Sequence, residues 1–135
     1  MYKRQGIPAG IFTSPITFPD QIESLFNPTL SRALLLEALD NAENIYTGLE
    51  TSTVSLSSLL VNIERQDIDT EILTAFAEAR TQIETLNESL REQVLTDNDQ
   101  MLITRDTLQR IITALKVDLT SVLGVDIIFA DNDGD

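Results

Sequence analysis

The chain has 135 residues, of which 42% are hydrophobic and only nine are Gly or Pro, so it is long enough for one domain with a modest core and does not read as disordered. It carries 22 acidic and 9 basic residues, a formal net charge of −13, and no basic cluster, which disfavours nucleic-acid binding and attachment to anionic membranes. Cysteine and histidine are both absent, which excludes disulfides, thiolate sites, cysteine nucleophiles and the commonest general base and metal ligand.

The first segment is rich in proline. Residues 1–19 hold three of the four prolines and predict an extended lead-in or linker, within which we interpret residues 1–5 as non-native. No signal peptide and no transmembrane segment is recognisable. Asp20 followed by Glu23 predicts a short capped helix to about Phe26, which Pro28 ends.

The next two segments read as amphipathic helices joined by a polar turn. Ser31 is placed to cap a helix that ends at Gly48. A polar turn follows at residues 51–53, and a second helix runs from about Leu56 to Gln66. The apolar residues of the first helix recur every three to four positions and form one face: Leu34, Leu35, Ala38, Leu39, Ala42, Ile45 and Tyr46.

The clearest periodicity lies at residues 68–95. Its apolar residues are Ile68, Ile72, Phe76, Ala79, Ile83, Leu86, Leu90 and Val94. This spacing predicts one helix of about seven turns, because a strand would scatter these side chains to both faces. Residues 96–99 break that helix and offer a new cap, and the last helix ends at Gly124. Beyond it, Val125 and residues 127–129 predict a short extended segment packed on the helices.

The predicted fold is therefore all-α. Short connections favour antiparallel neighbours, so residues 20–135 predict an up-down antiparallel four-helix bundle. The proline-rich lead-in precedes this domain, and a short extended acidic tail forms its C-terminal end.

Candidates for chemistry within the predicted helices are few. Glu84, Glu88 and Glu92 share one predicted helical face, where a carboxylate metal site is conceivable. They lie beside the apolar stripe, so we interpret them as a solvated face. Without histidine, a serine nucleophile would need Lys3 or Lys116 as its base, and a lysine late in a helix more often complements the helix dipole. We therefore expect this chain by itself not to be an enzyme.

The acidic tail is a separate candidate. Asp131, Asp133 and Asp135 have the opening spacing of a calcium-binding EF-hand loop, in which alternate residues supply oxygen ligands. The glutamate that completes such a loop is missing. We interpret the tail as a frayed acidic end and keep its three aspartates only as weak metal candidates.

In order and spacing, several segments resemble imelysin-like proteins. Residues 6–12 look like a segment in the middle of those proteins, and residues 31–40 fit the part that follows it. The most specific similarity is the end of the chain, where Leu115–Asp118, Leu123–Val125, Phe129 and Asp131–Asp135 are typical of that family's C-terminus.

The resemblance implies two helical bundles in tandem with a binding cleft between them. It implies an exported cell-envelope protein, periplasmic or anchored to the outer membrane, that is associated with iron uptake. The family is also catalogued as peptidases on a Gly-x-His-x-x-Glu motif in the N-terminal bundle, and this chain has no histidine to supply it.

This chain would then be the C-terminal bundle, without a cofactor of its own. Its partner would be the missing N-terminal bundle, through which iron, another metal or an iron-bearing ligand would be held. The linker beside the cleft would be formed by Gly6, Ile7, Pro8, Ala9 and Gly10.

A second hypothesis is a free-standing helical-bundle module that binds a protein partner. Leu34, Leu35, Leu36 and Leu39 form a dense apolar cluster. Leu36 falls outside the main stripe, so it either faces a neighbour or packs under the lead-in.

Overall fold

The computed structural model describes residues 8–11, 16–22, 24, 26–49 and 54–125. All regular structure in these residues is helical, and no strand occurs among them, which confirms the predicted all-α class. The acidic tail, with Asp131, Asp133 and Asp135, lies outside the described residues, as do Gly6 and Ile7 of the predicted linker.

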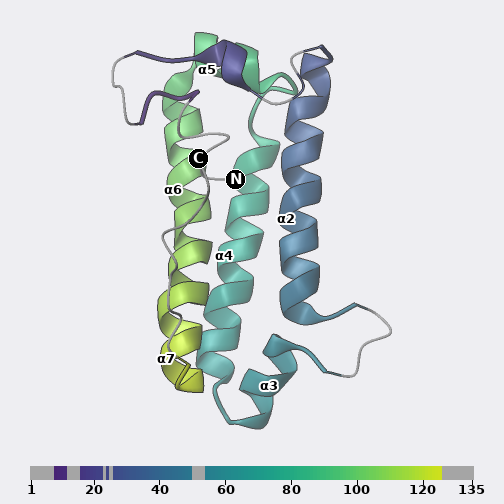
Figure 1. Cartoon of the computed structure of the whole chain (residues 1–135), viewed down its shortest axis with the longest axis vertical. Coiled ribbons are helices and arrows are strands. Elements are labelled where there is room, and N and C mark those ends of the chain that lie inside the picture. The colour runs from purple at the N-terminus through teal and green to yellow at the C-terminus, as the bar shows by residue number, and fades with distance from the viewer. Residues whose placement is uncertain (1–7, 12–15, 23, 25, 50–53, 126–135) are drawn as a thin grey trace.

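Three long helices form the body of the molecule: α2 (Ser31–Thr47), α4 (Gln66–Glu84) and α6 (Asn98–Thr113). They run in alternating directions, and α4 is the central helix, packed against both α2 and α6 (Figure 1). The expected helix at residues 56–66 is only the seven-residue α3 (Leu56–Asn62), so the described residues do not supply a fourth long helix.

Short elements complete the ends. The predicted helix at residues 20–26 is replaced by the 3₁₀ turn η1 (Pro19–Gln21). Pro28 opens the turn η2 (Pro28–Leu30) instead of ending a helix, because its fixed φ suits a first helical position. After α6 the helix widens into a π turn, η3 (Ala114–Asp118), and continues as α7 (Leu119–Leu123) to Gly124.

The single helix predicted over residues 68–95 is wrong, because a turn divides it. The first part, α4, ends at Glu84, and α5 (Leu90–Thr96) begins after Ser89, whose hydroxyl accepts the Glu92 N–H. The side-chain oxygen of Gln93 accepts the Asn87 N–H at 2.8 Å and holds the turn closed. The apolar stripe nevertheless stays buried on both sides of the break, which is why its periodicity concealed the turn.

The beginning of α2 also differs from the prediction. Ser31 does not cap its own helix; its hydroxyl accepts the Leu90 N–H at 2.9 Å and so serves the start of α5. Arg32 donates from its guanidinium to the Leu86 carbonyl oxygen at 2.6 Å. These contacts fasten the first turn of α2 to the loop between α4 and α5.

The core lies along the central helix. Phe76 of α4 is fully buried and stacks on Tyr46 of α2, with ring centroids 6.3 Å apart. Leu36 packs partly buried against this core, whereas Leu34 is 42% exposed and does not belong to it. Among the described helices, none combines the length and apolar character that a membrane span requires.

Candidate functional site

The lead-in forms a turn against the start of α6. Pro8 and Ala9 are buried, and the Asn98 side-chain amide donates to the Ala9 carbonyl oxygen at 2.9 Å. The backbone N–H of Phe18 donates to the Pro8 carbonyl oxygen at 2.9 Å and closes the loop. The described part of the predicted linker therefore lies on the helices as a fixed turn.

A hollow of about 460 Å³ opens between this turn and α6. It is lined by Ala9, Gly10, Ile11, Asn98, Asp99, Leu102, Arg105 and Asp106. Arg105 forms an ion pair with Asp106 at 2.6 Å, and Asp99 lies in the first turn of α6. The hollow thus combines backbone, one guanidinium and two carboxylates, groups that suit a polar ligand better than an apolar one.

Gly10 is the residue on which this turn depends. Its φ is +77°, and a Cβ there would lie 2.5 Å from the Ile16 carbonyl oxygen. We expect Gly10→Ala to lower the free energy of unfolding by about 2 kcal/mol or more, because the left-handed backbone alone costs about 1–2 kcal/mol and the clash adds to it. Hydrogen exchange of the Phe18 amide, which closes the loop, should accelerate.

Gly124→Ala is the matched control. Gly124 also has a positive φ, +62°, but a Cβ there would meet nothing within 4 Å. Gly124→Ala should lower the free energy of unfolding only by the cost of the left-handed backbone, about 1 kcal/mol. Hydrogen exchange of the Phe18 amide should stay unchanged. Equal losses in urea unfolding for the two variants would show that the close approach to Ile16 does not hold the turn.

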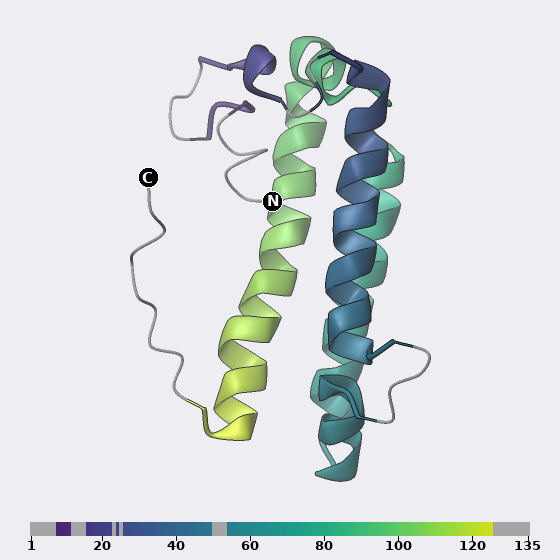
Figure 2. The same ribbon diagram turned by 45° about the vertical axis from the view of Figure 1, so that its right-hand side comes forward.

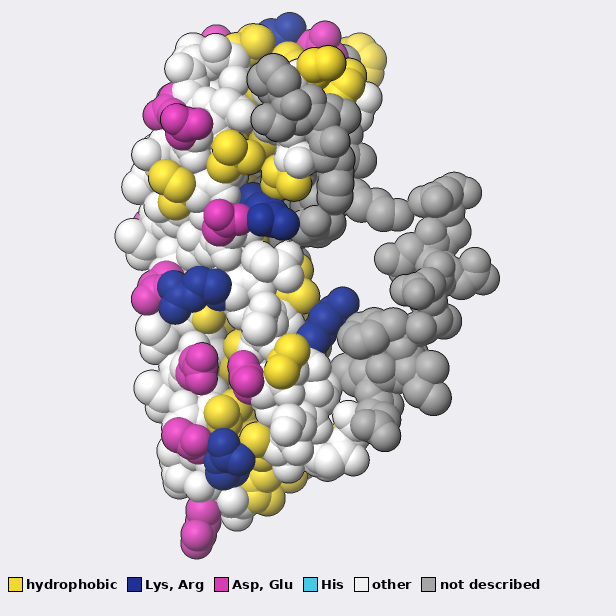
Figure 3. All heavy atoms as spheres, turned by 90° about the vertical axis from the view of Figure 1, so that its left-hand side faces the viewer, with side chains coloured by type: hydrophobic (Ala, Val, Ile, Leu, Met, Phe, Trp, Pro, Cys, Tyr) yellow, Lys and Arg dark blue, Asp and Glu magenta, His cyan; other side chains and the backbone are white. Residues whose placement is uncertain are grey.

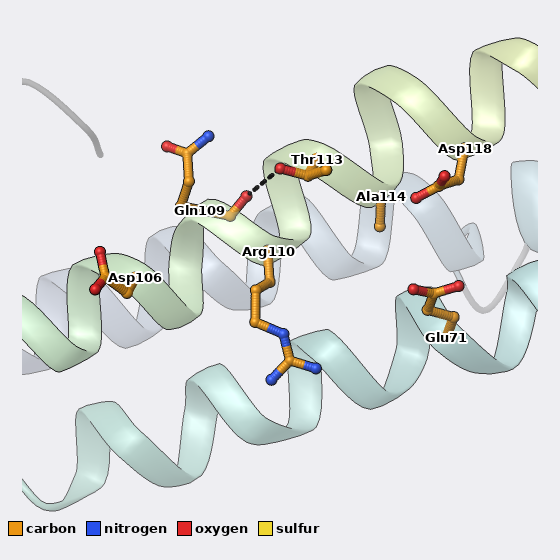
Figure 4. A pocket seen from close by; sticks show the side chains of 7 residues that line it. All are labelled: Glu71, Asp106, Gln109, Arg110, Thr113, Ala114 and Asp118. Carbon is orange, nitrogen blue, oxygen red and sulfur yellow. Dashed lines mark hydrogen bonds between the residues drawn. The ribbon is translucent and has the colours of Figure 1, made fainter.

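A second hollow, of about 340 Å³, lies between α4 and α6 beside the π turn. Figure 4 shows Glu71 of α4 and Asp118 of the π turn pointing toward one another across it. Arg110 points toward α4, where it pairs with Glu78, while Asp106 and Gln109 point away. Two facing carboxylates favour a cation, but the part of the chain that the structure describes contains no group of three acidic side chains placed to hold a metal ion.

The glutamates singled out from the sequence are not brought together. Glu84 ends α4, Glu88 lies in the following turn and Glu92 lies in α5, so they do not share one helical face. Glu88 instead lies 3.7 Å from the Arg32 guanidinium. Lys116 lies exposed on the π turn.

Charge is spread over the surface on the α6 side of the molecule. In Figure 3 the basic and acidic side chains alternate along this face, with apolar side chains between them and without a basic patch. Among the described residues, Arg105 pairs with Asp106 and Arg110 pairs with Glu78, so these guanidinium groups are neutralised by neighbouring carboxylates. This face therefore offers no cationic track for a phosphate backbone.

Sequence reasoning missed both hollows. Each one depends on side chains from segments far apart in the chain, such as Ala9 with Arg105, or Glu71 with Asp118. The π turn has no marked sequence signal, since Ala114–Asp118 continues the apolar period of α6. Gly10 lies in the stretch that the sequence predicts to be an extended lead-in, so the turn that it forms was not predicted either.

No protein-family model matches this chain, and neither the curated proteins nor the solved structures contain a significant match to it.

Proposed function

We propose that the chain is the C-terminal helical domain of an imelysin-like bacterial envelope protein implicated in iron uptake, where it forms one wall of an interdomain binding cleft. It performs no catalysis of its own. The other wall is an N-terminal bundle that carries the Gly-x-His-x-x-Glu motif, and the protein is periplasmic or anchored to the outer membrane. The order of the residue segments that resemble that family supports this proposal.

The observation that carries the proposal is the position of the lead-in turn. In the segment that the resemblance assigns to the interdomain linker, Ala9 and Gly10 line the 460 Å³ hollow, and the preceding Pro8 is buried. A domain that precedes residue 8 would end near this rim and could cover it. Asp99 and Asp106 would then supply carboxylate oxygens from the C-terminal wall, which suit a hard cation or its hydrated chelate.

The first test is to read the coding sequence upstream of Met1 in frame. A continuous frame that encodes a signal peptide and a helix with Gly-x-His-x-x-Glu is the expected result. A stop codon followed by a genuine start site at Met1 would contradict the proposal and would favour a free-standing module.

Iron binding provides the second test. By calorimetry with ferric citrate, we expect the 135-residue chain to bind far more weakly than the longer protein, because one wall supplies too few ligands. In the longer protein, Asp99→Asn should weaken binding several-fold, whereas Glu84→Gln, which removes the same charge at the exposed end of α4, should not. Tight stoichiometric binding by the 135-residue chain alone would contradict the proposal.

The second candidate function is a free-standing helical module that binds a protein partner. The observation that favours it is an apolar stripe on α2 that no described element covers.

A further inference from the structure

We draw no further inference here: the strongest candidate, the hollow beside the π turn through which α6 continues into α7 (Figure 2), rests on the carboxylates of Glu71 and Asp118 alone, and nothing else among the described residues points to a ligand there.

Discussion

Phe76→Ala is expected to lower the free energy of unfolding by about 3–5 kcal/mol. Phe76 is fully buried on the central helix and stacks on Tyr46, so its removal leaves a cavity between α2 and α4 that the long helices cannot close. A domain of this size has a total stability of about 5–15 kcal/mol, so the variant should be close to unfolding at 37 °C. Urea denaturation followed by circular dichroism measures the change.

Phe26→Ala is the matched control for this substitution. Phe26 is fully exposed, so the same loss of a phenyl ring should change the stability by less than about 0.5 kcal/mol. If Phe26→Ala were as costly as Phe76→Ala, the core would not be centred on α4 as described.

Tyr46→Phe should lower the free energy of unfolding by about 1.5–3 kcal/mol. The Tyr46 hydroxyl donates to a carboxylate oxygen of Asp69 at 2.6 Å, and both side chains are buried. The substitution removes the donor but leaves the carboxylate desolvated. In the double variant Tyr46→Phe/Asp69→Asn both side chains are neutral. Its loss of unfolding free energy should be smaller than the sum of the losses of the two single variants, because the pair is coupled.

The same hydrogen bond predicts a dependence on alkaline pH. Burial, followed by the hydrogen bond to Asp69, raises the pKa of Tyr46 above its usual value near 10. The hydroxyl therefore ionises more readily in the unfolded chain than in the folded one. The stability that its protonated form contributes is complete below pH 10 and is lost as the pH rises above that value. Above that pH, the free energy of unfolding should fall by at most about 1.4 kcal/mol per pH unit because of this one group.

The Tyr46→Phe variant isolates this effect from the other alkaline titrations. It should lack the part of the stability loss above pH 10 that Tyr46 causes, while the remaining loss stays as in the wild type. Parallel stability–pH curves for the two proteins between about pH 9 and pH 11 would contradict the assigned role of the hydroxyl.

The helical class and several boundaries could be predicted from the sequence because they depend on neighbouring residues. Gly48 and Gly124 follow helices at positions where φ is positive, and Asp97 accepts the Gln100 N–H at the start of α6. The apolar period predicts that Phe76 and Ile83 face the core, and both side chains are fully buried. These features are local, so a single sequence contains the information that sets them.

Some helix ends are set by hydrogen bonds from a distant segment of the chain, and only the tertiary structure determines these ends. The sequence predicts Ser31 as the cap of α2, yet its hydroxyl accepts the N–H of Leu90, 59 residues further along the chain. The turn between α4 and α5 keeps the apolar period, so only Gln93 and the approach of α2 reveal it. The tendency to form helices is set by each stretch of chain, whereas the pairing of the helix ends and the two hollows depend on which helices come to lie side by side.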